Sequence, residues 1–208
     1  MIIDPSQMRP RDAYQLLIGS VVPRPIAWVS TVSPDGQFNL APFSFFMGIS
    51  GDPPLMAVTV NKRRRDKQDF KKDTLSNVEA LGELVINIAN EELAEKMNLT
   101  SGEYPAEVDE FDLAGLTPAP SQVIRPPYVA EAPISIECKV NQIVYVGHEG
   151  RESGVIIAEG LLWHVRDDLL TPNQTIDVTK LHAIGRLSYN NYTRTNDLFE
   201  MIRPDARG

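Results

Sequence analysis

A basic segment in the first half of the sequence carries the side chains that an anion site would use. In "NKRRRDKQDFKKDTLSN", which begins at Asn61, seven Lys and Arg residues lie within eleven positions. Asp73 or Thr74 is a natural helix cap, and the start of a helix offers N–H groups and a partial positive charge. Lys72 adds a full charge and Thr74 a hydroxyl donor, so the segment suits a phosphate dianion. The alternative is an ordinary capped helix after a solvated basic loop.

A second stretch, "QFNLAPFSFFMGISGDPP" at residues 37–54, combines aromatic and small apolar residues with isolated hydrogen-bonding groups. Pro42 excludes a continuous helix, and the apolar residues do not alternate as in a half-exposed strand. The stretch is therefore either plain core or the wall of a site for a flat, aromatic, partly polar ligand. Together with the basic segment, it fits a phosphorylated flavin better than either stretch does alone.

Known catalytic motifs are absent from the sequence. It contains no G-x-S-x-G, no H-E-x-x-H and no Walker loop. The three histidines, His148, His164 and His182, have no partners at metal-ligand spacing. We expect His164 to be structural and His148 to be exposed in a turn. A self-sufficient hydrolase is therefore not indicated.

Composition and charge narrow the class of protein. The chain has 208 residues and a net charge of −8, which favours one globular domain (residues 1–208, core about 20–201) and disfavours nucleic-acid binding. No apolar run approaches the roughly 20 residues of a membrane span, and the N-terminus lacks a signal-peptide core. A single cysteine fits a reducing compartment. We therefore expect a cytoplasmic protein that binds neither nucleic acid nor membranes.

The elements that must position these residues are mainly strands. Residue patterns and turn signals predict strands at residues 27–33, 37–50, 55–61, 83–89, 133–147 and 152–170, the last being either a strand pair or one long bent strand. Helices are expected from Asp73 or Thr74 to Gly82, after a cap at Asn90, and after Thr195. Together, these strands and helices predict an antiparallel β-barrel with a few short helices at its ends.

Three further features of the sequence have simple structural interpretations. Cys138 alternates with aliphatic residues and is predicted to be a buried core thiol. Trp163 is also predicted to be core, whereas Trp28 could be core or could face the ligand. Residues 100–129 are expected to be irregular and to act as a lid, an interface arm or a linker.

Several motifs, in this order, resemble the flavin reductase-like proteins that have the FMN-binding split-barrel fold. They are "RPIAWVSTVSPDGQFNLAPFSFFMGISGDPPL", "KKDTLSNVEALGELVINIANEELAEKMN", "FDLAGLTPAPS", "PPYVAEAPISIECKV" and "GRLSYNNYTRTNDLFEM", and they run from about Arg24 to Met201. The resemblance implies a six-stranded antiparallel split β-barrel, a homodimer, and FMN bound non-covalently near the dimer interface. It also implies reduction of the flavin by NADH or NADPH, with a possible monooxygenase or electron-transfer partner.

Two other functions remain open on the same resemblance. The chain could be a flavoredoxin-like electron carrier without its own nicotinamide activity, or a barrel that has lost FMN. Since the flavin carries the chemistry, an enzyme of this kind needs no catalytic triad.

The resemblance also implies which residues form the site. The expected cofactor-binding residues are Arg24, Trp28, Ser30, Thr31, Asn39, Leu40, Ala41, Pro42, Phe43, Ser44, Lys72, Asp73, Thr74 and Tyr192. Arg186 and His182 are the expected catalytic residues, Arg186 by stabilising negative charge on the flavin. Several family members have "GRLGG" where this chain has "GRLSY", so Ser188 and Tyr189 are expected to narrow the space over the flavin.

Overall fold

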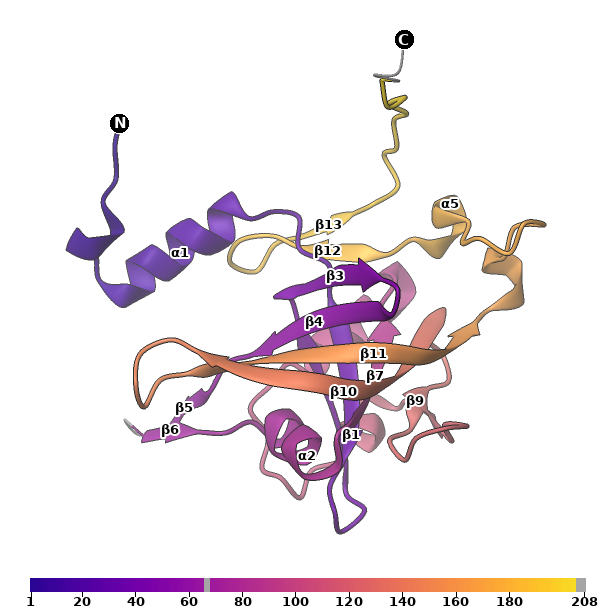
Figure 1. Cartoon of the computed structure of the whole chain (residues 1–208), viewed down its shortest axis with the longest axis horizontal. Coiled ribbons are helices and arrows are strands. Elements are labelled where there is room, and N and C mark those ends of the chain that lie inside the picture. Colours follow the sequence, from indigo (N-terminus) through magenta and orange to yellow (C-terminus); the bar gives the residue numbers. More distant parts are fainter. Residues whose placement is uncertain (66–67, 205–208) are drawn as a thin grey trace.

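A computed structural model describes residues 1–65 and 68–204, with residues 63–65 and 68–70 described by their backbone only. Its centre is a seven-stranded antiparallel sheet that curves around one core (Figure 1). The strands of this sheet are β1 (Ala27–Val32), β2 (Phe38–Phe43), β3 (Phe46–Gly51), β4 (Pro54–Val60), β7 (Glu83–Ile88), β10 (Ile134–Val146) and β11 (Ser153–Val165). They pair in the order β2-β1-β7-β10-β11-β4-β3, so the two edge strands follow one another in sequence.

Short elements surround this sheet. The helices are α1 (Pro10–Ser20), α2 (Asp73–Leu81), α3 (Ala94–Leu99), α4 (Glu110–Ala114) and α5 (Val178–Leu181), with single 3-10 turns at Pro5–Gln7, Glu91–Leu93 and Asp167–Leu169. The small strand pairs are β5 (Arg63–Arg65) with β6 (Gln68–Phe70), β8 (Pro118–Ala119) with β9 (Tyr128–Val129), and β12 (Ile184–Arg186) with β13 (Tyr192–Arg194). In the described part of the chain, no helix has the length and apolar character needed to cross a membrane.

The stretch predicted as one strand at residues 37–50 forms two strands, which corrects the sequence prediction and gives the sheet seven strands instead of six. The chain turns at Ser44 and Phe45, where the backbone oxygen of Phe45 accepts from the N–H of Thr59 at 2.9 Å. The corner carries the chain from β2, at one edge of the sheet, to β3, at the other. Because apolar residues continue through the corner, hydrophobic periodicity alone could not show it.

Two helix boundaries were predicted correctly, one was wrong, and one helix was missed. Gly82 ends α2 with a φ of 67°, and the side chain of Asn90 caps the next turn by accepting from the N–H of Leu93 at 3.2 Å. Lys72, not Asp73 or Thr74, is the N-cap of α2, and it makes no side-chain cap bond. Helix α1 was not predicted.

The helix expected after Thr195 is absent from the described residues up to Pro204. Residues in this tail are exposed, Phe199 and Ile202 at more than 80%. Without an apolar face packed on the protein, so short a segment gains too little to form a helix.

The core has two parts, one on each face of β1 and β2. Ala27, Val29 and Phe43 belong to the cluster inside the barrel, together with residues of α2, β4, β7, β10 and β11. Trp28 and Leu40 point to the other face and pack with residues of α3 and α4. Every residue of β1 is therefore buried, and the indole N–H of Trp28 donates to Thr100 Oγ1 at 2.9 Å.

Cys138 is fully buried, as predicted, and burial raises the pKa of its thiol to about 12. Trp163, in contrast, is 43% exposed, so its prediction as core was wrong. Its ring lies over Gly160, where an added Cβ would come within 2.4 Å of the indole. Trp28, which was expected either in the core or facing the ligand, is fully buried.

A buried carboxylate anchors the long segment between α3 and β10. Glu137 on β10 is fully buried and accepts from the backbone N–H groups of Gln122 at 2.7 Å and Val123 at 2.8 Å. It also lies 2.6 Å from His164 Nε2, and the His164 ring stacks on Tyr128 with centroids 4.2 Å apart. His164 is therefore structural, as expected, and His148 is exposed in its turn.

Candidate functional site

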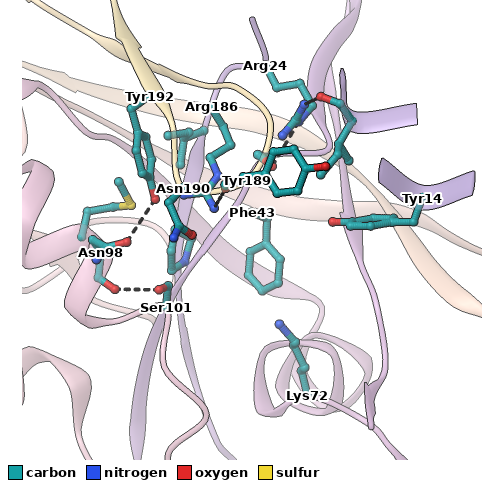
Figure 2. Close-up of a pocket in the computed structure, with 15 residues that line it drawn as sticks. Tyr14, Arg24, Phe43, Lys72, Asn98, Ser101, Arg186, Tyr189, Asn190 and Tyr192 are labelled. Carbon is teal, nitrogen blue, oxygen red and sulfur yellow. Dashed lines mark hydrogen bonds between the residues drawn. The ribbon is translucent and has the colours of Figure 1, made fainter. Parts of the chain in front are cut away.

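A cavity of about 730 Å³ lies where six separate parts of the chain meet. They are α1, the residues before β1, the corner after β2, the ends of α2 and α3, and the hairpin that joins β12 to β13 (Figure 2). Its volume is within the range of small-molecule sites. The lining residues are Tyr14, Ile18, Arg24, Ile26, Pro42, Phe43, Ser44, Lys72, Met97, Asn98, Ser101, Arg186, Tyr189, Asn190 and Tyr192.

Arg24 holds one wall of this cavity together. Its guanidinium, 5% exposed, donates to the backbone oxygens of Ile18, Val21 and Leu187, each at 2.8 Å. The backbones of Arg24 and Arg186 also exchange two hydrogen bonds, at 2.9 and 2.8 Å. One side chain thus ties α1 and the hairpin to the lead-in of β1. Burial, and to a lesser degree the positive charge of Arg186, lower the pKa of Arg24.

The hairpin brings Arg186 and Tyr192 to the same end of the cavity. The Arg186 guanidinium lies 4.4 Å from the centre of the Tyr192 ring and donates to the backbone oxygen of Tyr189. The Tyr192 hydroxyl donates in turn to Asn98 Oδ1 at 3.1 Å, which fixes the hairpin against α3 (Figure 2). Tyr189 has a φ of 52° and is 65% exposed, so a left-handed backbone conformation holds its side chain at the rim.

Lys72 and Phe43 form the opposite end. Lys72 Nζ lies 5.3 Å from the centre of the Phe43 ring, and Figure 2 shows Phe43 between Lys72 and Arg186. A smaller hollow of about 140 Å³ continues from here and is lined partly by Thr59, Asn61 and Lys72. Lys71, next in sequence, points elsewhere and pairs with Glu79 at 2.6 Å.

The electrostatic character of the cavity is opposite to that of the chain. Its described lining includes the cations Arg24, Lys72 and Arg186 but neither Asp nor Glu, although the chain carries a net charge of −8. Positive side chains gathered in a concave site attract anions. The site therefore suits an anionic ligand with a flat apolar part that can lie against Phe43 and the tyrosines.

Seven of the sixteen residues expected at the site line this cavity. Those that do are Arg24, Pro42, Phe43, Ser44, Lys72, Arg186 and Tyr192. The others lie elsewhere: Trp28, Ser30, Thr31, Leu40 and Thr74 are almost completely buried, and Ala41 packs against the barrel core. His182 is exposed and bonds to Asn196 Oδ1 at 3.1 Å. Whether any of these residues contacts a cofactor stays a prediction.

A buried polar network explains what some of these residues do in the fold. Asn39 Nδ2 donates to Thr74 Oγ1 at 2.9 Å and to Thr31 Oγ1 at 3.3 Å, and Asn77 Nδ2 donates to Thr31 Oγ1 at 3.0 Å. The network ties the first turn of α2 to β1 and β2. It therefore fixes the position from which Lys72 reaches the cavity, while Asp73 and Asn39 line a separate hollow of about 340 Å³.

Several lining residues were not expected from the sequence. Tyr14 and Ile18 lie one helical turn apart on α1, a spacing that could have indicated a shared face had the helix been recognised. Asn98 and Asn190 lie within the quoted motifs but were not expected at the site, and Ser101 belongs to none of them; all three reach the cavity only through the tertiary fold. Of the basic segment, Lys67 and the side chains of residues 63–65 lie outside the described residues.

The chain matches the flavin reductase like domain family over residues 18–185. Nitrilotriacetate monooxygenase component B from Bacillus cereus is 33% identical, with a TM-score of 0.91 over 97% of this chain and 98% of that one. 2-Nitrobenzoate 2-nitroreductase NbaA from Pseudomonas fluorescens is 30% identical, with a TM-score of 0.87 over 98% and 96%.

A third similar structure, from Shewanella frigidimarina, is described as having a split barrel domain; it is 20% identical, with a TM-score of 0.82 over 96% of each chain. This likeness concerns the fold, and it confirms the predicted fold class. With the match over most of its length and the shared architecture, the chain belongs to the flavin reductase like domain family.

Proposed function

We propose that the chain binds FMN in the 730 Å³ cavity and catalyses its reduction by NADH or NADPH. The observation that carries this proposal is the set of three cations and aromatic side chains around one cavity, without a carboxylate among its described lining residues, on a flavin reductase like fold. Bound flavin would supply the hydride chemistry.

The residues present fit such a cofactor. Lys72, at the start of α2, would hold the phosphate, with Thr59 and Asn61 beside it in the adjoining hollow. Pro42, Phe43 and Ser44 would form the wall for the ring. Because β2 ends at Phe43 and the Phe45 oxygen is bonded to Thr59, the backbone of Ser44 would be the part of the corner that bonds to a ligand.

Arg186 and Tyr189 would act at the other end. The charge of Arg186 would stabilise negative charge on the ring, because a cation placed in advance costs no reorganisation during the reaction. Tyr189, at the rim, would exclude water. His182 lies outside the cavity on an exposed turn, and its proposed catalytic role is tested by His182→Gln, which should leave reduction unchanged if the residue only bonds to Asn196.

An absorbance spectrum after addition of FMN and desalting tests the proposal, followed by anaerobic NADH and then NADPH. Retained flavin that bleaches with either nucleotide supports a reductase. Retained flavin that resists both indicates the electron carrier instead. Loss of the flavin on desalting calls for a binding titration, and no binding in that titration would refute the cofactor.

The neighbours suggest what the electrons serve. One is a component of a nitrilotriacetate monooxygenase and another a 2-nitrobenzoate reductase, so we propose delivery to a monooxygenase partner or to a small acceptor. We also propose a homodimer, since Met47 and Ile49 on β3 and Leu161 and Trp163 on β11 are each more than 40% exposed. Light scattering that gives the mass of one chain would exclude the dimer.

A further inference from the structure

We propose that the Arg186 end of the cavity binds the carboxylate of a small planar organic acid beside the flavin. The inference rests on the proposed function and deepens it, because it names the chemical class of the second ligand. Charge, hydrogen-bond donors and shape each support it at that end of the cavity.

The charge argument compares the arginines of the chain. Four of them pair with carboxylates in the described structure: Arg9 with Asp12, Arg125 with Glu83, Arg166 with Asp168 and Arg194 with Glu91, at 2.5 to 3.0 Å. Arg24 and Arg186 have no such partner among the described residues, and their backbones lie hydrogen-bonded side by side. Two neighbouring cations in a cavity favour an anion that neutralises them.

The donor argument concerns the same end. A guanidinium has five N–H donors. Those of Arg24 are mostly used inside the protein, whereas Arg186 makes one side-chain hydrogen bond, to Tyr189, within the described chain. The side-chain oxygen of Asn98 accepts from Tyr192. Its amide hydrogens have no acceptor among the described residues. A ligand here must therefore bring acceptor oxygens, and a carboxylate matches the fork of a guanidinium.

The shape argument comes from the aromatic side chains. Tyr192 packs face-on with Arg186, and Tyr189 stands at the rim in a left-handed backbone conformation that glycine would adopt more easily. Strained residues persist where the surrounding structure holds them, often at ligand sites. A flat ring would fit between these side chains with its carboxylate on Arg186.

The phosphate of the flavin would not occupy this place. In Figure 2, Phe43 separates Lys72 from Arg186, so the cavity has two cationic ends. The Lys72 end adjoins the hollow of Thr59 and Asn61, which offers further polar groups to a phosphate. The Arg186 end therefore remains for a second anion.

Benzoate and benzamide test the proposal, because they have the same ring and size and neither is reduced. Each is titrated into the FMN-loaded protein, and binding is followed by calorimetry and by the change in the flavin spectrum. We expect benzoate to bind roughly 10- to 100-fold more tightly, the effect of one charge-assisted hydrogen-bonded pair. Equal binding of the two, or binding of neither, would overturn the proposal.

Variants assign the effect to Arg186. Arg186→Gln should remove the preference for benzoate, and Arg186→Lys should keep part of it. Arg194→Gln is the matched control, because Arg194 lies on the same hairpin but pairs with Glu91 outside the cavity. A preference that survives in Arg186→Gln overturns the assignment. If that variant does not fold, Arg186→Lys is compared with Arg194→Gln in its place. A smaller preference for benzoate in Arg186→Lys supports the assignment, and an equal preference in the two variants overturns it.

The design separates this proposal from the proposed function. Protein that retains FMN but does not distinguish benzoate from benzamide keeps its function and refutes the second anion site, as expected if the flavin ring takes all the free N–H donors of Arg186. Protein that does not bind FMN refutes the function. The same pair of ligands, titrated by calorimetry into the flavin-free chain, then decides the anion site by itself.

Discussion

Two groups of charged side chains in this molecule have opposite surroundings. The carboxylate of Glu137 is surrounded by donors of its own chain, the N–H groups of Gln122 and Val123 and the ring of His164. The guanidinium groups at the cavity, in contrast, find no carboxylate among the described residues. The first arrangement is complete and holds the fold, whereas the second requires something from outside. Polar groups can thus be divided into structural and ligand-binding ones by whether their hydrogen-bond and charge partners belong to the same chain.

The largest effect is expected from removing the Glu137 carboxylate. Glu137→Leu removes a fully buried carboxylate and leaves two backbone N–H groups and His164 without their acceptor, and we expect a loss of about 3–5 kcal/mol in the free energy of unfolding. Urea denaturation of the flavin-free protein measures it. Glu149→Gln, on the exposed turn between β10 and β11, is the control and should stay within about 0.5 kcal/mol. A loss for Glu137→Leu near that of the control would contradict the structural role.

Lowering the pH is a second way to remove the same acceptor, because it protonates the Glu137 carboxylate. Burial alone would raise the pKa of Glu137, but the hydrogen bonds from Gln122, His164 and Val123 outweigh it and hold the pKa below its usual value. A lowered pKa means that this stabilisation is present above the unfolded-state value and is lost as the pH falls through the lower folded-state value. Melting temperatures of the wild type should therefore drop more steeply below about pH 4 than those of Glu137→Gln. If the melting temperatures of the two proteins fall in parallel with pH, the lowered pKa of Glu137 is contradicted.

The next effect concerns Arg24, which belongs to both groups, since it holds the fold and lines the cavity. Arg24→Lys keeps the charge but cannot reach the three separate backbone oxygens, so we expect a loss of about 2–3 kcal/mol and weaker FMN binding. Thermal unfolding and a flavin titration measure the two. Arg11→Lys, on the exposed side of α1, should change neither. Full stability in Arg24→Lys would show that α1 and the hairpin do not depend on this clamp.

Lys72 is expected to act through ligand binding. Lys72→Gln should weaken FMN binding roughly 10- to 100-fold, because one charged contact to the phosphate is lost. Lys71→Gln is the control, since Lys71 pairs with Glu79 outside the cavity. Flavin fluorescence quenching gives the dissociation constants. Equal effects of the two changes would place the phosphate elsewhere.

The smallest effect is expected at the rim. Tyr189→Gly removes the strain of a left-handed non-glycine residue, so the protein should gain up to about 1 kcal/mol even though a large side chain is lost. The same change opens the cavity, and bound flavin should dissociate faster in a stopped-flow measurement. Lower stability together with unchanged dissociation would mean that Tyr189 is a packing residue.

The sequence was informative where a single segment determines the outcome. Gly82 and Asn90 mark element ends because one residue's backbone or side chain suffices for a cap, and Cys138 lies on a strand whose alternation assigns its face. The motifs also identified the cavity residues from Pro42 to Ser44.

Prediction from sequence failed where distant segments decide. The corner at Ser44 and Phe45 depends on which strand each half pairs with, and the exposure of Trp163 depends on what covers β11. Asn98 and Asn190 face one cavity only because the β12–β13 hairpin folds over α3, an arrangement that no local spacing records.

The two tryptophans provide a built-in optical reporter. Trp28 is enclosed in the core behind β2, whereas the indole of Trp163 lies on Gly160 with nearly half of its surface in water. Their emission should therefore divide into a component that a dissolved quencher cannot reach and one that it can. Covering β11 with a second copy of the chain would shield the accessible component. Unlabelled protein could thus show, by its own fluorescence on dilution, the concentration at which the copies separate.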